Sequence, residues 1–298
     1  MKLGVIGLGS MGMGAALNLV RKGHETSGCD LRAPAREEFS RAGGQAVQRP
    51  AELPDGLNAV ILFVVNAGQV EDVLFGAAGC VGRLAPGAIV VCCTTMAPEA
   101  ARTIGARLDA AGIAMLDAPV SGGASAAREG RMTVMASGPD AAFAHAQPLL
   151  DAIAGKVWRL GQAHGAGSTV KMVNQLLAGV HIAAAAEAMA LGIRAGADPQ
   201  TLFDVITTSA GNSWMFQNRI PHVLAGDDTP LSSVNIFVKD LGIVLDQARS
   251  LTFPLPLAAA AHQLFLAAAA AGHGGRDDAF VIRVWQMLTG IRLPEAKP

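Results

Sequence analysis

The chain has 298 residues, which is long for a single hydrophobic core, because domains usually contain about 100–200 residues. Only 16% of its residues are charged, its net charge is −1 and it has no basic block, so the composition excludes the electrostatic footprint of a nucleic-acid-binding or membrane-surface protein. So little charge favours burial of apolar surface against another subunit, and we expect two domains and an oligomer.

Cysteine spacing and the length of the apolar runs indicate the cellular compartment. The four cysteines have no C-x-x-C spacing and no metal-ligand pattern with the seven histidines, so we expect buried thiols in a reducing cytosol and no metal site. The glycine-rich N-terminus does not read as a signal peptide, and no apolar run reaches the ~18 residues of a membrane span without an interrupting glycine or charge. The expected location is the cytoplasm.

Short apolar segments alternate with helical segments in the first half of the chain. The expected strands are Lys2–Ile6, Thr26–Asp30, Ala59–Val65, Ala88–Cys93 and Ala114–Asp117, and the clearest helices are Met11–Lys22 and Ala97–Ala111. Continuous apolar runs such as residues 59–65 are typical of strands buried on both faces. The alternation predicts βαβ units and a Rossmann-type, doubly wound α/β sheet over residues 1–163.

The pattern changes after about residue 163. Thr169–Ala195 carries apolar residues at helical spacing without proline, and Asp198-Pro199 is typical of a helix N-cap followed by proline. The segments 183–186 and 257–271 are rich in alanine, the best helix former, which permits close helix packing. Residues 164–298 are therefore expected to form an all-α helical domain that serves substrate binding and oligomerisation.

A glycine-rich motif follows the first expected strand and opens the first expected helix. It reads Gly7-Leu8-Gly9-Ser10-Met11-Gly12, a G-x-G-x-x-G, which is weak alone but strengthened by its place inside a βαβ unit. Gly7 suits the tight turn, Gly9 the approach to a pyrophosphate and Gly12 close helix–strand packing. The motif predicts a dinucleotide site that includes these six residues.

An acidic residue at the end of the second expected strand indicates which dinucleotide binds. Asp30 lies 18 residues beyond Gly12, where a carboxylate accepts hydrogen bonds from the adenosine ribose and repels a 2′-phosphate. This favours NAD over NADP. Arg32 weakens the inference, because a guanidinium is able to reach a 2′-phosphate, and a solvated acid at a strand end is the alternative for Asp30.

Two segments carry groups suited to substrate chemistry. Ser121-Gly122-Gly123 offers a hydroxyl and consecutive unobstructed backbone N–H groups, suitable for a carboxylate, although a plain turn has the same sequence. Lys171 lies in the first turns of the long helix, and Asn174 and Gln175 follow it on the same helix face. Spacing alone favours a solvated helix lysine as the interpretation of Lys171.

Three motifs in a fixed order make the chain resemble the 3-hydroxyisobutyrate dehydrogenase-related family of β-hydroxyacid dehydrogenases. They are Asp117-Ala118-Pro119-Val120-Ser121-Gly122-Gly123, then Gly165-Ala166-Gly167 with Lys171 and Asn174 downstream, and Lys239-Asp240-Leu241. With the N-terminal glycine motif, the resemblance covers nearly the whole chain. It implies an enzyme of the NAD-dependent hydroxy-acid dehydrogenase class that acts on a small molecule and assembles as a homodimer or homotetramer.

The resemblance also implies roles for individual residues. The lysine that matches Lys171 is the general acid/base on the substrate hydroxyl, and burial or a neighbouring cation must adapt its free pKa of ~10.4 to this task. The residues that match Ser121, Gly122 and Gly123 bind the substrate carboxylate. The remaining positions are placed near substrate or cofactor: Val65, Asn66, Thr95 and Lys239. Family members often carry an asparagine four residues after the lysine, but here Gln175 stands there and Asn174 precedes it, which leaves open which amide faces the substrate.

The choice of hydroxy-acid is less well defined. The polar segment 211–219, together with residues 63–66 and 235–241, resembles the branch of the family that oxidises the four-carbon acid L-threonate. Asn212, Ser213 and Arg219 are able to hydrogen-bond extra substrate hydroxyls, although helix capping is the alternative. We therefore expect oxidation of L-threonate at C2 to the 2-keto acid.

Other functions remain open from the sequence. A 3-hydroxyisobutyrate dehydrogenase or a tartronate semialdehyde reductase would use the same residues. An imine reductase is disfavoured by Lys171, which that family usually lacks. A non-catalytic dinucleotide-binding module is the alternative from a different class, and NAD binding without turnover of any hydroxy-acid would favour it.

Overall fold

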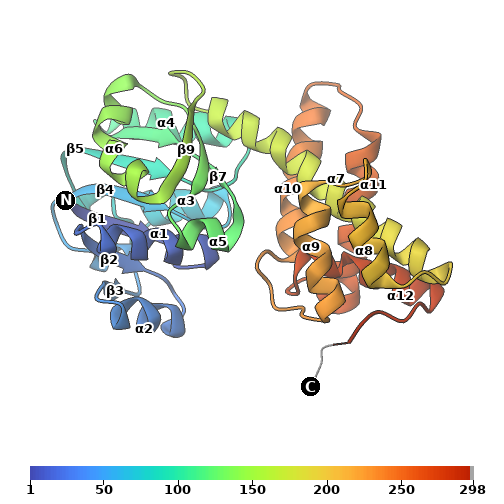
Figure 1. Cartoon of the computed structure of the whole chain (residues 1–298). Helices are drawn as coiled ribbons and strands as arrows, with labels where there is room; N and C mark the ends of the chain where they lie inside the picture. Colours follow the sequence, from blue (N-terminus) through green and yellow to red (C-terminus); the bar gives the residue numbers. More distant parts are fainter. Residues whose placement is uncertain (296–298) are drawn as a thin grey trace. The chain divides into compact units, whose positions relative to one another are not determined.

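The structure, a computed structural model, describes residues 1–295, and the chain divides into two compact units, Met1–Lys171 and Met172–Pro298. The first unit contains the strands, coloured blue to green in Figure 1, and the second is built from helices, coloured yellow to red. Residues 296–298, which end the expected helical domain, lie outside the described residues.

The main sheet of the first unit has six parallel strands in the order β3-β2-β1-β4-β5-β6. The strands are β1 (Lys2–Ile6), β2 (Glu25–Cys29), β3 (Gln45–Val47), β4 (Leu57–Leu62), β5 (Leu84–Cys92) and β6 (Ala114–Asp117). The order reverses between β1 and β4, the point at which open α/β sheets bind ligands beyond the carboxyl ends of their strands.

Helices cover both faces of this sheet, so that its strands are buried on both sides. The helices are α1 (Ser10–Arg21), α2 (Ala33–Arg41), α3 (Ala67–Phe75), α4 (Pro98–Ala110) and α6 (Asp140–Ile153), with short 3₁₀ turns η1 (Pro50–Glu52) and η2 (Val81–Arg83). One core contains buried residues of α1, α2 and α6, and a second core contains those of α3 and α4. The doubly wound α/β fold expected from the alternating pattern is confirmed.

A small second sheet follows the main one and was not expected from the sequence. It contains β7 (Val120–Ser121), β8 (Met132–Ala136) and β9 (Ala154–Arg159). Strand β7 pairs antiparallel with β8, β9 pairs parallel with β8, and the short helix α5 (Gly123–Arg128) lies between β7 and β8 in the chain. This sheet fixes the segment that begins at Asp117 and contains Ser121.

The second unit is helical, as the change of pattern after residue 163 predicts. Its helices are α7 (Ala166–Arg194, which begins in the first unit), α8 (Pro199–Thr207), α9 (Trp214–Ala225), α10 (Val234–Ser250), α11 (Pro256–Ala268) and α12 (Arg283–Thr289), with a π-helical turn η3 (Ala269–His273) and a 3₁₀ turn η4 (Asp278–Ile282). Alanines of α7 and α11 are buried in its core, where their small side chains permit close packing. Asp198 caps α8 with proline at the first helical position, as expected.

Helix α7 is long and apolar. An 18-residue window of it has a mean hydropathy of 1.8, and 39% of that window is buried. Length and composition alone would allow such a helix to cross a membrane, but core helices of soluble proteins have the same properties, so this is weak evidence for a span.

Candidate active site

The glycine motif lies immediately after β1 and has the steric properties that a dinucleotide loop requires. Gly7 has φ +94, which L-residues with side chains rarely adopt, and a Cβ on Gly12 would lie 1.8 Å from the carbonyl oxygen of Gly7. Gly9, by contrast, faces open space, since a Cβ there would meet no atom within 4 Å. Backbone N–H groups at the start of α1 are thus approachable, and no side chain caps this helix.

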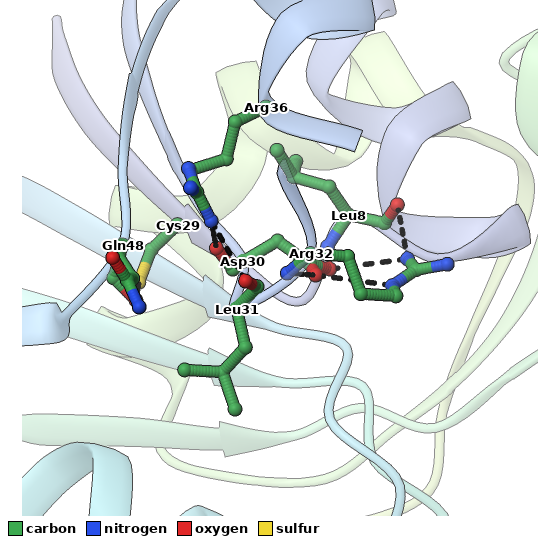
Figure 2. A network of polar contacts seen from close by, with 7 residues as sticks. All are labelled: Leu8, Cys29, Asp30, Leu31, Arg32, Arg36 and Gln48. Carbon is green, nitrogen blue, oxygen red and sulfur yellow. Dashed lines mark hydrogen bonds and ion pairs between the residues drawn. The ribbon is translucent and has the colours of Figure 1, made fainter. Parts of the chain in front are cut away.

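Asp30 follows β2 and receives hydrogen bonds from two sides, as Figure 2 shows. Its Oδ2 accepts the backbone N–H of Leu8 at 2.8 Å, and its Oδ1 accepts the backbone N–H of Arg32 at 2.8 Å. The Arg32 guanidinium lies 3.1 Å from Oδ1 and also donates to the carbonyl oxygen of Leu8 at 3.0 Å. Burial alone would raise the pKa of Asp30, but these hydrogen bonds, chiefly those from Arg32, lower it below the ordinary value.

Arg36 supports the same turn from the side opposite Arg32 (Figure 2). Its guanidinium donates to the carbonyl oxygens of Asp30 and Leu31, both at 2.8 Å. The side chain of Arg32 is 62% exposed, whereas that of Asp30 is 10% exposed. The carboxylate is therefore held in a fixed position beside the glycine loop, where it is able to accept hydrogen bonds from a ribose. These residues fit an adenine dinucleotide with its pyrophosphate at the start of α1.

The other positions expected near a cofactor follow the neighbouring strands. Val65 and Asn66 come after β4, and the Asn66 side chain caps α3 by accepting the Gln69 N–H at 2.9 Å. Thr95 follows β5 and is half-buried. Because β1, β2, β4 and β5 are parallel, the residues after their carboxyl ends lie along one edge of the sheet, which is the edge that carries the glycine loop.

The expected carboxylate-binding segment begins at the end of the last strand of the main sheet. Ser121 ends β7, Gly122 precedes α5 and Gly123 opens it. Gly122 has φ +127 and Gly123 has φ +72, so the turn depends on glycine at both positions. Ser121, Gly122 and Gly123 are half-buried, which leaves their polar groups within reach of a ligand.

Lys171 lies in the second turn of α7, six residues after Gly165. The whole residue is 6% exposed, so it is not the solvated helix lysine that its spacing alone allowed. Burying a lysine amine costs free energy unless hydrogen bonds or an opposite charge compensate for the lost water. Buried ionisable side chains are therefore candidates for functional sites.

Asp117 opens the first of the three family motifs, but it was not predicted as a site residue. It ends β6, is fully buried, and accepts hydrogen bonds from the backbone N–H groups of Gly165 at 3.0 Å and Ser168 at 2.8 Å. Burial raises the pKa of its carboxyl group, although the donors of Ser168 and Gly165 oppose this. A buried acid directly after a strand, followed by the Ser-Gly-Gly turn, was the signal that could have identified it.

A second polar cluster forms within the second unit around Asp240. The Gln175 amide nitrogen donates to Asp240 Oδ2 at 2.5 Å, and Lys239 Nζ lies 2.7 Å from Asp240 Oδ1. Asn174 donates to the Gln175 amide oxygen at 3.0 Å. Two of the expected site residues, Gln175 and Lys239, thus contact one carboxylate in a residue that is 2% exposed, and Asn174 is joined to it through Gln175. Asp240 was not predicted as a site residue.

The polar segment 211–219 is used largely within the fold. The Ser213 hydroxyl caps α9 by accepting the Phe216 N–H at 3.0 Å, and buried Arg219 pairs with Asp278 at 2.6 Å. Asn212 donates to the Thr207 carbonyl oxygen at 3.1 Å, while its own amide oxygen is buried without a hydrogen-bond partner among residues 1–295. Helix capping, the alternative considered for this segment, accounts for Ser213, and an ion pair accounts for Arg219.

The cysteines are buried within the fold. All four cysteines are buried and free, and burial raises the pKa of Cys29, Cys80 and Cys92 to about 12. No group of three or more His, Cys, Asp or Glu side chains that could hold a metal ion occurs in residues 1–295.

Comparisons with known proteins agree with this geometry. Residues 2–161 match the family model for the NAD binding domain of 6-phosphogluconate dehydrogenase, and residues 165–285 match the model described as NAD-binding of NADP-dependent 3-hydroxyisobutyrate dehydrogenase. Both models describe nicotinamide dinucleotide enzymes, so the cofactor is NAD or NADP.

The similarity to individual relatives extends over nearly the whole chain. An L-threonate dehydrogenase from Cupriavidus necator is 59% identical over 98% of this chain and 97% of its own length, and one from Escherichia coli K12 is 52% identical over 99% and 97%. A crystal structure of a 3-hydroxyisobutyrate dehydrogenase from Salmonella typhimurium has a TM-score of 0.90 and 51% identity, and covers 95% of this chain and 99% of that one.

Fold, family models and relatives therefore agree. The chain is a nicotinamide-dependent hydroxy-acid oxidoreductase that acts on a small molecule, as the sequence motifs predicted. It belongs to the 3-hydroxyisobutyrate dehydrogenase-related family of β-hydroxyacid dehydrogenases.

Proposed function

We propose that the chain oxidises L-threonate at C2 to 2-dehydro-L-erythronate with NAD. The observation that carries this proposal is the 52–59% identity to proteins named L-threonate dehydrogenase, over nearly the full length of both chains. Identity at this level through both units favours retention of the substrate as well as of the fold.

The preference for NAD rests on Asp30. Its carboxylate has a lowered pKa, is therefore ionised at neutral pH, and lies directly beside the glycine loop. A fixed negative charge there repels a 2′-phosphate and accepts hydrogen bonds from the ribose. Bound NAD would supply the hydride acceptor for the alcohol carbon.

We assign proton transfer to Lys171. Its neutral amine accepts the hydroxyl proton at Nζ, and the ammonium form then stabilises the reacting oxygen. Burial of the residue supports this role, because a buried amine is kept away from bulk water, which would otherwise exchange protons with the reacting oxygen.

We assign the substrate carboxylate to the turn at Ser121, Gly122 and Gly123. The Ser121 hydroxyl and the backbone N–H groups of the two glycines are consecutive donors of the kind that bind anions. Anchoring the carboxylate fixes the neighbouring alcohol carbon, and such positioning accounts for much of the rate gain in enzymes of this kind.

Further substrate and cofactor contacts remain proposals. They involve Asn174, Gln175, Asn212 and Lys239 in the second unit, and the glycine-motif residues 7–12, Arg32, Val65, Asn66 and Thr95 in the first. The buried, unpartnered amide oxygen of Asn212 supports its inclusion. We assign dinucleotide binding to residues 1–163, and substrate binding and oligomerisation to residues 164–298.

We also propose a cytoplasmic homodimer or homotetramer. Free, buried thiols fit a reducing compartment. Helix α7 exposes Val170, Val173, Leu177 and Leu191, which recur on one face of the helix, and a second copy of the chain would cover such a stripe. A monomeric mass by light scattering at micromolar concentration would contradict the assembly.

The experiment is a panel of hydroxy-acids with the purified protein and NAD, followed by NADH absorbance. The panel contains L-threonate, D-threonate, D-erythronate, 3-hydroxyisobutyrate and D-glycerate. We expect a strong preference for L-threonate, and a loss of kcat of at least ~10³-fold in Lys171→Ala, a magnitude typical of removing a general acid/base.

The matched control is Lys156→Ala, which removes an exposed lysine of β9 and should leave kcat unchanged. Turnover restricted to 3-hydroxyisobutyrate or D-glycerate would keep the mechanism but replace the substrate, and reduction of tartronate semialdehyde in preference to any oxidation would favour the reductase. Undiminished kcat in Lys171→Ala would overturn the assignment of proton transfer.

A further inference from the structure

The carboxylate of Asp117 is the most heavily hydrogen-bonded buried acid in the first unit. Oδ2 accepts the backbone N–H of Gly165 at 3.0 Å and that of Ser168 at 2.8 Å, and Oδ1 accepts the Ser168 hydroxyl at 2.7 Å. The Ser137 hydroxyl lies 3.4 Å from Oδ2. Asp117 and Ser137 are fully buried and Ser168 is 1% exposed, so water does not compete for these bonds.

These bonds cap the first turn of α7. The first N–H groups of a helix have no acceptor within the helix, and the residue before it usually supplies one from its side chain. Here that residue is Gly165, which has no side chain and whose carbonyl oxygen accepts the Thr169 N–H at 2.9 Å. The acceptors come instead from the ends of two strands, because Asp117 binds Gly165 and Ser168 while the Ser137 hydroxyl accepts the Gly167 N–H at 3.0 Å.

The approach of α7 to these strands is close. A Cβ on Gly167 would lie 2.4 Å from the carbonyl oxygen of Met135 and 2.5 Å from that of Asp117, so only glycine fits. Asp117 itself is held by backbone bonds in both directions with Ser137, at 3.0 and 2.9 Å. The start of α7 is thus fixed in register against a rigid part of the sheet.

Asp117 also begins the segment that carries Ser121, Gly122 and Gly123. One buried carboxylate therefore joins this segment to the first turn of the helix that carries Lys171, which lies three residues after Ser168. We propose that Asp117 is a positioning residue that fixes Lys171 relative to the Ser121–Gly123 turn. This inference rests on the proposed function, in which Lys171 transfers the proton.

The test compares Asp117→Asn, Asp117→Ala and Ser168→Ala with the wild-type holoenzyme. Asparagine keeps an acceptor for the backbone N–H groups but removes the charge, alanine removes both, and Ser168→Ala removes one hydrogen bond while the charge remains. We expect kcat to fall about 10-fold for Asp117→Asn and about 100-fold for Asp117→Ala, since misplacement by ~1 Å has effects of this size. The KM for hydroxy-acid and the Kd for NAD by calorimetry should stay within about twofold, because transition-state interactions alone are lost.

The pH profile distinguishes positioning from loss of folding. Asp117→Asn removes a buried negative charge from the first turn of the helix that carries Lys171, so the acid limb of kcat should move to lower pH. Ser168→Ala should lower kcat several-fold without moving this limb. The matched control is Asp198→Ala, which removes the N-cap of α8 and should lower thermal stability while leaving kcat and its pH profile unchanged.

The outcomes separate this inference from the proposed function. Full kcat in Lys171→Ala would contradict the proposed function itself. Loss of kcat in Lys171→Ala, together with wild-type kcat and pH limb in folded Asp117→Asn and Ser168→Ala, would show that Asp117 serves only stability and would overturn the positioning role. If Asp117→Ala does not fold, the other two variants decide.

Discussion

The Asp30 carboxylate and the Arg32 guanidinium satisfy each other at the end of β2. The Arg32 guanidinium donates to both the Asp30 carboxylate and the Leu8 carbonyl oxygen. These contacts hold the guanidinium at Asp30, so it is less available to bind a 2′-phosphate. The spacing of these residues was visible in the sequence, but their pairing was not, because spacing does not define side-chain conformations. Arg32 therefore weakens the preference for NAD less than its sequence position suggested.

This pairing predicts how the cofactor preference responds to mutation. Asp30→Ser removes the repulsion of a 2′-phosphate and releases Arg32, so the ratio of kcat/KM with NADP to kcat/KM with NAD should rise about 10–100-fold, the effect of a charged hydrogen bond worth ~1.5–3 kcal/mol. Steady-state kinetics with both dinucleotides measure it. The control is Asp30→Ser/Arg32→Ala, which should lose most of the gain with NADP. A gain that survives in the double variant would contradict the role of Arg32.

At the scale of elements, the strongly apolar strands and long helices were predictable and the small sheet was not. Strands β1 and β6 have the expected bounds, and α7 begins three residues earlier than expected, at Ala166. Strand β7 was missed because it has two residues, and β9 (Ala154–Arg159) because it is largely exposed and carries three polar or glycine positions within its six residues. Strand β8, a short apolar segment, was missed as well. One acceptor that caps α7, the Ser137 hydroxyl, directly follows β8, so the start of α7 depends on this sheet.

The close packing at the start of α7 predicts opposite effects for two helix glycines. Gly167→Ala introduces a Cβ against two carbonyl oxygens, and overpacking of this kind costs about 1–3 kcal/mol of unfolding free energy. Gly242→Ala in α10 meets only His262, at 3.9 Å, and should stabilise by about 0.5–1 kcal/mol, because alanine is the better helix former. Urea unfolding of both variants measures the difference, and equal effects would contradict the steric argument.

At the scale of the whole molecule, the composition and the change of pattern correctly predicted an α/β part followed by a helical part. What they did not predict were the buried acids. Asp117, Asp240, Asp277 and Asp278 all bind partners far away in the sequence, and no local pattern reveals such partners. Lys171 was ambiguous from spacing, and only the family motifs distinguished it from a solvated lysine.

One of these acids makes the stability of the second unit depend on pH. His222 Nδ1 lies 3.2 Å from Asp277 Oδ1, and this hydrogen bond raises the pKa of His222 despite its partial burial. A histidine with a raised folded-state pKa stabilises the fold fully below its unfolded pKa of about 6.5, and the contribution is lost as the pH rises through the folded-state value. Burial raises the pKa of neighbouring Asp278 to about 6, so its titration overlaps the lower end of this range, and only the difference between the wild type and a His222 variant isolates the histidine.

We therefore expect the unfolding free energy of wild-type protein, relative to His222→Gln, to decrease as the pH rises from about 6.5 through the raised folded-state pKa of His222. Urea unfolding at several pH values measures both proteins. His145→Gln, a change on α6 in the first unit, is the matched control and should keep the wild-type slope. If the unfolding free energy of His222→Gln changed with pH as that of the wild type does, His222 would not contribute to the pH dependence.

The distant cap of α7 has a consequence for the order of folding. Its acceptors and donors are separated by 48 and 51 residues, so the first turn of the helix gains its hydrogen bonds only after a long loop has closed and β6 has joined the sheet. The amide protons of Gly165 and Ser168 should then exchange with solvent as slowly as those of the sheet interior, although they stand at a helix end where fraying is the rule. The first turn of α7, the helix that leads into the second unit, is thus expected to form its cap only after the sheet of the first unit has formed.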